Sequence, residues 1–100
     1  MKSKEAIEIE FAKAINEAQE LENVAKSLTS IANSIITKET VILEKAWKGN
    51  NSMALSMKGR DLSTDIFDVA QNLYTVAKSI RTTADLVYKA EKAAILMALS

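Results

Sequence analysis

Apolar residues recur every seven positions along almost the whole chain, and no proline interrupts them. In the first half, this spacing is followed by Ile7, Ala14, Leu21, Leu28, Ile35 and Ile42. In the second half, it is followed by Ile66, Leu73, Ile80, Val87 and Ala94. Apolar residues at this spacing form one stripe on an α-helix. The sequence therefore predicts an all-α fold with two long helices, over residues 5–46 and 52–98.

A short polar segment that contains Gly49 separates the two periodic halves. Glycine suits the left-handed residue that follows a helix, and Asn or Ser suits the N-cap of the next one. We therefore expect a turn over residues 47–51 and an antiparallel hairpin in which residues 1–100 form a single domain. The β-branched residues in segments 35–37 and 40–42 are weak helix formers. The seven-residue column nevertheless keeps its phase from Ile35 to Ile42, so the first helix is expected to be continuous.

Alanine dominates a second set of positions in both predicted helices. Four residues beyond the first column lie Phe11, Ala18, Ala25, Ala32 and Ala46, and in the second half Ala70, Ala77 and Ala84. Small side chains at this spacing let two helices approach closely. We therefore expect the contact inside the hairpin to be lined by Ala18, Ala25, Ala32, Ala70, Ala77 and Ala84. The alternative is that alanine is frequent only because it is the best helix former.

The predicted helices carry more apolar residues than one neighbouring helix can cover. The surplus positions, which we predict to be a partner interface, are Val24, Ile31, Leu62, Phe67, Val69, Tyr74, Val76, Tyr88 and Ile95. Exposed apolar surface of this extent usually marks an interaction site. Two hairpins that assemble into a four-helix bundle would bury it.

Several kinds of chemistry lack the residues that they require. The chain has no histidine and no cysteine, which excludes Ser-His-Asp and Cys-His catalysis and thiolate metal sites. Asp61, Asp65 and Asp68 share a helix face, but a solvated acidic surface near a helix start explains them better than a metal site. We therefore expect no enzymatic activity, no cofactor and no metal.

Charge and hydropathy limit the partners. The formal net charge is zero, whereas nucleic-acid-binding proteins usually carry a basic surplus. No stretch approaches the roughly 20 consecutive apolar residues of a membrane-spanning helix. The first residues also lack the apolar core of a cleaved signal peptide. We expect neither nucleic-acid binding nor stable membrane insertion.

Trp47, Lys48 and Gly49 form a Trp-x-Gly motif near the midpoint of the chain. A chain of this length with two long helices and a central Trp-x-Gly turn resembles the WXG family of type VII (ESX) secretion. The segments 80–84 and 88–91 resemble the branch of Gram-positive bacteria that accompanies LXG-type toxins. On the plainer interpretation, Trp47 only closes the end of a helical bundle.

The resemblance implies a secreted partner or adaptor protein. It implies a homodimer, or a complex with a second small hairpin or with the helical N-terminal domain of an LXG toxin. It also implies export from the cytoplasm by the type VII ATPase without a cleaved signal peptide.

The export signal of the family, Tyr-x-x-x-Asp/Glu or Phe-x-x-x-Asp, is not present in its standard form. The residues four positions after Phe67, Tyr74 and Tyr88 are Gln71, Lys78 and Lys92. Glu91 lies three positions after Tyr88 and therefore shares its helix face. Either Tyr88 and Glu91 form a variant signal, or a partner supplies the signal.

Two other functions are compatible with the pattern. One is a structural helical-hairpin module that oligomerises and has no link to secretion. The other is a membrane-active amphipathic hairpin, which is disfavoured because the lysines do not gather on one polar face.

Overall fold

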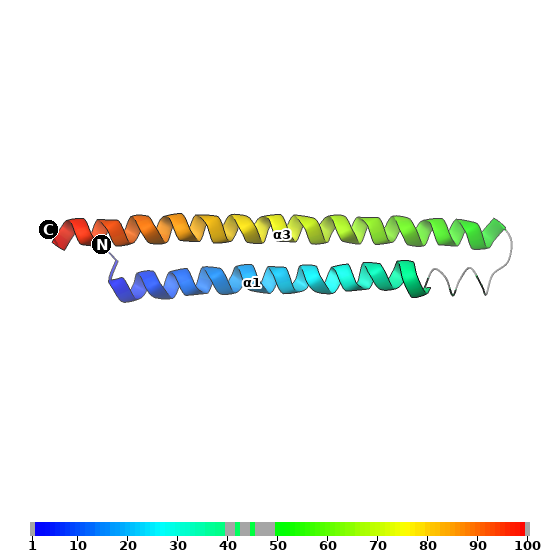
Figure 1. Cartoon of the computed structure of the whole chain (residues 1–100), viewed down its shortest axis with the longest axis horizontal. Helices are drawn as coiled ribbons and strands as arrows, with labels where there is room; N and C mark the ends of the chain where they lie inside the picture. The colour runs from blue at the N-terminus through cyan, green and yellow to red at the C-terminus, as the bar shows by residue number, and fades with distance from the viewer. Residues whose placement is uncertain (1, 40–41, 43–44, 46–49, 100) are drawn as a thin grey trace. The chain divides into compact units, whose positions relative to one another are not determined.

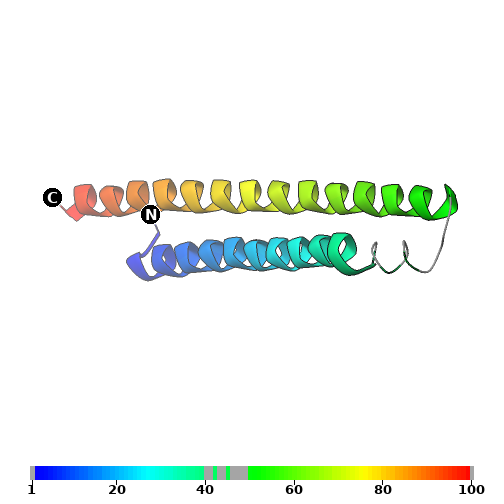
Figure 2. The ribbon, with the colours of Figure 1, turned by 45° about the vertical axis from the view of Figure 1, so that its right-hand side comes forward.

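Two long helices make up most of this computed structural model, which describes residues 2–39, 42, 45 and 50–99. Helix α1 comprises Lys4–Ser34, a π-helix η1 comprises Ile35–Glu39, and helix α3 comprises Asn50–Leu99. No strand occurs within these ranges. Helices α1 and α3 pack against each other and run in opposite directions (Figures 1 and 2). The predicted all-α fold of two long antiparallel helices is confirmed, whereas the four-helix bundle would require a second hairpin and stays a prediction.

Helix α1 begins with a serine cap. The Ser3 hydroxyl oxygen accepts a hydrogen bond from the Ala6 N–H at 3.1 Å, and the Ser3 carbonyl accepts one from the Ile7 N–H at 3.1 Å. Glu5 adds a negative charge in the first turn, where the helix dipole favours it. These contacts explain why the helix starts at Lys4, one residue before the predicted position.

The prediction of one continuous α-helix over residues 5–46 is wrong, because the regular α-helix ends at Ser34. From Ile35 the backbone follows a π-helical path, which usually occurs as a short insertion in an α-helix. Ile35, Ile36 and Thr37 are β-branched and therefore crowd the preceding turn. The Thr37 hydroxyl donates a hydrogen bond to the Asn33 carbonyl at 2.7 Å, a contact that bends helices.

The predicted turn is only partly covered by the structure. Trp47 and Gly49 lie outside the described residues. Asn50 and Asn51, which we had placed in the turn, already belong to α3. Asparagine is a weak but tolerated helix residue, and the first turn of a helix suits it better than the interior. Helix α3 therefore starts two residues earlier than predicted and ends one residue later, at Leu99.

The contacts of the chain divide into two compact units. Unit 1 contains Met1–Glu22 and Tyr74–Ser100, and unit 2 contains Asn23–Leu73. Each unit therefore contains a segment of α1 and a segment of α3. The expectation of a single domain over residues 1–100 stays a prediction, and the units are described separately below.

Unit 2 is held together by residues with very small side chains. Ala25, Ala32 and Ala70 are completely buried, and Ser63 is buried to the same extent. The Ser63 hydroxyl donates a hydrogen bond to the Ala32 carbonyl at 2.9 Å, which joins α3 to α1. Ser56, one heptad before Ser63, is also buried. The prediction that the alanines line the contact between the helices is confirmed in this unit.

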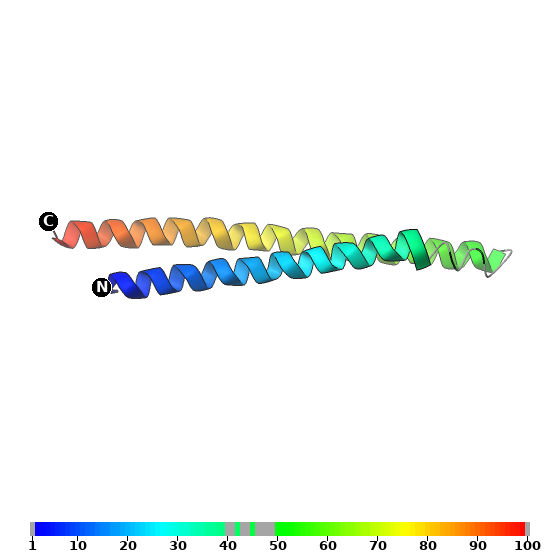
Figure 3. The same cartoon turned by 60° about the horizontal axis from the view of Figure 1, so that its bottom comes forward.

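In unit 1, the contact between the helices contains both buried alanines and larger side chains. Ala18 and Ala77 are completely buried, whereas Ala84 is only half-buried. Ile7 is 2% exposed. Near it, the rings of Phe11 and Tyr88 lie with their centroids 4.4 Å apart. The α1 and α3 segments of this unit remain side by side in a third view (Figure 3).

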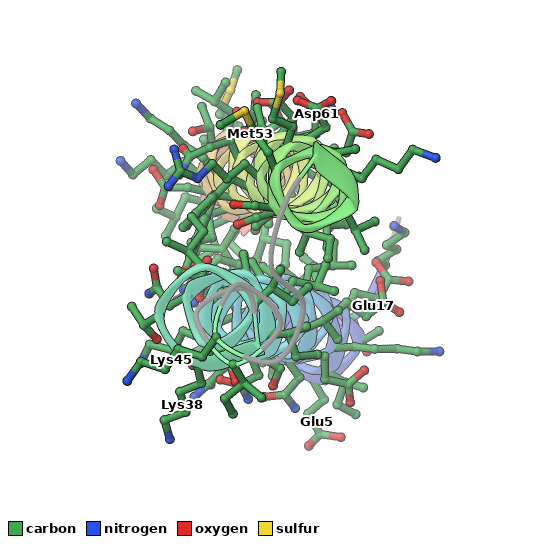
Figure 4. The ribbon with its side chains drawn as sticks, turned by 90° about the vertical axis from the view of Figure 1, so that its right-hand side faces the viewer. Glu5, Glu17, Lys38, Lys45, Met53 and Asp61 are labelled. Carbon is green, nitrogen blue, oxygen red and sulfur yellow. The ribbon has the colours of Figure 1, made fainter. Side chains whose placement is uncertain are left out.

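Charged side chains lie on the outer surfaces of the helices. Figure 4 shows the side chain of Glu5 pointing away from α3, that of Glu17 at the side of α1, and those of Met53 and Asp61 pointing away from α1. Glu5, Glu17 and Asp61 are all exposed. This distribution is expected for helices that each present one apolar stripe to a neighbour.

Candidate interaction surface

Five of the nine predicted interface residues are about half exposed. In α1, Val24 and Ile31 are each 50% exposed. In α3, Leu62, Val69 and Val76 are 53%, 51% and 48% exposed. Within each helix these residues are seven positions apart, so they lie on one face. The four residues of unit 2 form an exposed apolar set (Val24, Ile31, Leu62 and Val69) with the composition of an interaction surface, whereas Val76 belongs to unit 1.

The other predicted interface residues are less exposed. Phe67, Tyr74, Tyr88 and Ile95 are all half-buried. They share a seven-residue column with Arg81, whose side chain pairs with Glu22. Arg81 donates two hydrogen bonds to the Glu22 carboxylate, at 3.0 Å from Nε and 2.6 Å from Nη2. The column at Arg81 and Tyr88 thus contacts α1 within unit 1, so these two positions do not form free surface.

A groove of about 500 Å³ lies between α1 and α3 of unit 1. Its apolar lining on the α1 side consists of Ile7, Phe11 and Ala14. On the α3 side, it includes Val76, Ile80 and Val87. Among the lining residues, Val76 and Tyr88 are predicted interface residues. Ile80 and Val87 belong to the first apolar column of the second half, which is not part of the predicted interface, and Val87 is 47% exposed.

Tyr88 is the centre of a polar cluster that joins the two helices of unit 1. Its hydroxyl donates a hydrogen bond to Glu8 Oε1 at 2.7 Å and accepts one from Lys92 Nζ at 3.0 Å. Lys92 Nζ also lies 3.1 Å from Glu8 Oε1 and 4.9 Å from the centroid of the Tyr88 ring. Tyr88 therefore binds α1 through both its ring and its hydroxyl.

The charges of this cluster stabilise one another. The pKa of Glu8 lies below its ordinary value of 4.5. The hydrogen bond from Tyr88 is the largest cause, and the hydrogen bond from Lys92 is the second. The pKa of Lys92 is raised above its ordinary value of 10.5, mainly by its hydrogen bond with Tyr88 and secondly by its hydrogen bond with Glu8. Both shifts favour the charged form of the group, as expected for an ion pair.

Glu91, the second residue of the predicted export face, interacts with the N-terminal segment. Lys2 Nζ lies 3.1 Å from Glu91 Oε1 and 2.7 Å from Glu10 Oε2. The pKa of Lys2 is raised, mainly by its hydrogen bond with Glu10 and secondly by its hydrogen bond with Glu91. Tyr88 and Glu91 both line the groove, but their polar atoms contact different partners. Their role in export stays a prediction.

Acidification is expected to remove the stabilisation that the Glu8 carboxylate provides. Because the pKa of Glu8 is lower in the folded state than in the unfolded chain, this contribution is present above pH 4.5 and is lost as the pH falls through the folded-state pKa. The difference in melting temperature between wild type and Glu8→Gln should therefore shrink between about pH 6 and about pH 3. Circular dichroism measures this difference, and Glu17→Gln is the control. A difference that is constant with pH would contradict the role of the carboxylate.

No group of three or more His, Cys, Asp or Glu residues in the described part of the chain could hold a metal ion. Within the ranges that the structure describes, no buried side-chain nitrogen or oxygen lacks a hydrogen-bond partner. No helix in these ranges is both long enough and apolar enough to cross a membrane.

Comparison of the chain with models of known protein families, with curated proteins and with solved structures finds no match. The features of this chain that indicate a function are therefore the exposed apolar set, the groove and the resemblance of the central turn to a known motif.

Proposed function

We propose that this protein is a non-enzymatic partner or adaptor of type VII secretion that binds a second helical protein through its exposed apolar set. The observation that carries the proposal is the exposure of about half of each side chain of Val24, Ile31, Leu62 and Val69 in unit 2. Burial of apolar surface contributes about 25 cal/mol per Å², so covering these side chains favours association.

The preferred partner is another helical hairpin. The exposed residues within each helix recur every seven positions, which is the spacing used for packing between parallel or antiparallel helices. A second hairpin laid on this face would complete a four-helix bundle. It would be a second copy of the chain, another small hairpin, or the helical N-terminal domain of an LXG-type toxin.

The link to secretion depends on the resemblance of Trp47-Lys48-Gly49 to the WXG motif. On this proposal the protein leaves the cytoplasm through the type VII ATPase, together with its partner. Tyr88 and Glu91 would contribute to the export signal, or the partner would supply it. A scaffold module without a role in secretion is the competing function.

Two measurements in a native Gram-positive host test the proposal. The amount of the protein in the culture medium should fall strongly in a strain without the type VII ATPase, and equal amounts would contradict export by this route. Affinity capture from the same host should recover a helical toxin domain or a second hairpin. Recovery of copies of this chain alone would remove the toxin-partner version and leave the scaffold function.

Val69→Asp is expected to weaken capture of the partner by at least about tenfold, which corresponds to about 1.4 kcal/mol. The aspartate would have to lose its water in the complex, whereas it remains solvated in the free protein because Val69 is half exposed. Asn72→Asp, at an exposed position one turn further along α3, is the matched control. Circular dichroism must show that both variants are as helical as the wild type. Equal capture by both variants would remove Val69 from the interface.

A further inference from the structure

The groove of unit 1 has the length and the lining expected of a site for one helix. Its lining residues on α3 run from Thr75 to Glu91, which is about 24 Å along the helix at 1.5 Å per residue. A partner helix of about 16 residues would span this length. The volume of about 500 Å³ lies within the range of sites that accept apolar groups.

Two carboxylates are the only charged groups among the described residues that line the groove. Glu10 comes from α1 and Glu91 from α3. The ammonium group of Lys2 lies 2.7 Å from Glu10 Oε2 and 3.1 Å from Glu91 Oε1. The two carboxylates are therefore close enough to bind a single cation, and they make the groove acidic at this point.

Lys2 holds this position with little support from the fold. It precedes α1, which begins at Lys4, and its side chain is 49% exposed. Exposed ion pairs of this kind contribute little to stability because water and salt screen them. A cationic side chain that arrives with a bound helix can therefore replace Lys2.

We infer that the groove binds an amphipathic α-helix of a partner protein, and that a Lys or Arg near one end of its apolar stripe replaces Lys2 between Glu10 and Glu91. The apolar stripe contacts Val76, Ile80 and Val87. This inference rests on the proposed function as a partner-binding protein and specifies the chemistry of the helix that it binds. Charge complementarity selects this occupant, because the lining is apolar except for hydroxyl groups and these two carboxylates.

Synthetic peptides test the inference directly. The probes are fluorescein-labelled amphipathic helices of 16 residues, with leucine and alanine at the apolar heptad positions and one lysine in the first or the last turn. Matched peptides carry glutamate in place of the lysine. Fluorescence anisotropy with the full-length protein at about 0.15 M salt gives the affinities, since salt at this concentration screens weak, non-specific attraction. We expect one lysine peptide to bind at least about tenfold more tightly than its glutamate counterpart.

Four variants locate the cation and the bound helix. Glu10→Gln combined with Glu91→Gln should abolish the preference for lysine over glutamate. Glu17→Gln combined with Glu20→Gln removes two exposed carboxylates of α1 that do not line the groove, and should leave the preference unchanged. Lys2→Ala should strengthen binding of the lysine peptide by several-fold, because the internal competitor is gone. Val87→Asp, in the groove wall, should weaken binding of both peptides.

Four results would overturn the inference. These are equal binding of the lysine and glutamate peptides, a preference that persists in the Glu10→Gln and Glu91→Gln double variant, weaker binding of the lysine peptide to Lys2→Ala, and full binding to Val87→Asp. Self-association that blocks the peptides and is lost in Val87→Asp would show that a second copy occupies the groove. Capture and export in the native host are measured separately, so the inference can fail while the proposed function stands.

Discussion

Replacement of Ile7 by alanine is expected to lower the free energy of unfolding by about 2–5 kcal/mol. Ile7 is 2% exposed and is one of the largest fully buried side chains of the described residues. Its truncation removes apolar contacts and leaves a cavity beside the groove that it lines. For a chain of 100 residues, each kcal/mol shifts the melting temperature by about 4–8 °C.

The chain provides a control two positions away. Ile9 lies in the same helix and is 66% exposed, so Ile9→Ala should change stability by no more than about 0.5 kcal/mol. Thermal and urea unfolding of both variants should be compared at one protein concentration, because association would make the stability concentration-dependent. Similar losses in the two variants would mean that Ile7 is not buried as the structure places it.

Replacement of Ala25 by leucine is the second substitution with a large expected effect. Ala25 is completely buried in unit 2, where α1 and α3 pack through residues with small side chains. The additional carbon atoms of leucine have no space there and would push the helices apart, at a cost of about 1–3 kcal/mol. Urea unfolding measures the loss.

Ala12→Leu is the matched control for this substitution. Ala12 belongs to α1 but is exposed, and leucine is nearly as good a helix former as alanine. The control should therefore unfold like the wild type. If Ala25→Leu is as stable as Ala12→Leu, close packing through the alanines does not hold unit 2 together.

The alanine contact could be predicted because a heptad column has a regular spacing. Of the six alanines assigned to it, Ala84 is only half-buried, and five are completely buried, namely Ala18, Ala25, Ala32, Ala70 and Ala77. The same spacing could have identified Ser63 and Ser56, since they continue the column of Ala70 and Ala77 toward the start of α3. They were missed because only apolar residues were counted. A serine can take a buried position when its hydroxyl has a carbonyl acceptor, as Ser63 has in Ala32.

The partner interface was harder to predict than the alanine contact. Periodicity identifies surplus apolar columns, but it does not indicate which of them lie against the other helix. On spacing alone, both surplus columns of the second helix are predicted to be available to a partner. These are the column of Phe67, Tyr74 and Tyr88 and the column of Leu62, Val69 and Val76. The contact between Tyr88 and Glu8 depends on which residues of α1 lie opposite α3. The π-helix at Ile35 was missed because the apolar phase is the same before and after it.

The amino-acid sequence by itself determined the all-α fold and most of the alanines at the helix contact, because both depend on local propensity and on a spacing that repeats along one chain. Only the tertiary structure decided which surplus residues remain exposed, where the groove lies, and that Glu10 and Glu91 share one cation. Glu10 and Glu91 are 81 positions apart in the sequence. Their proximity follows from the alignment of two antiparallel helices, and no spacing within either helix encodes that alignment.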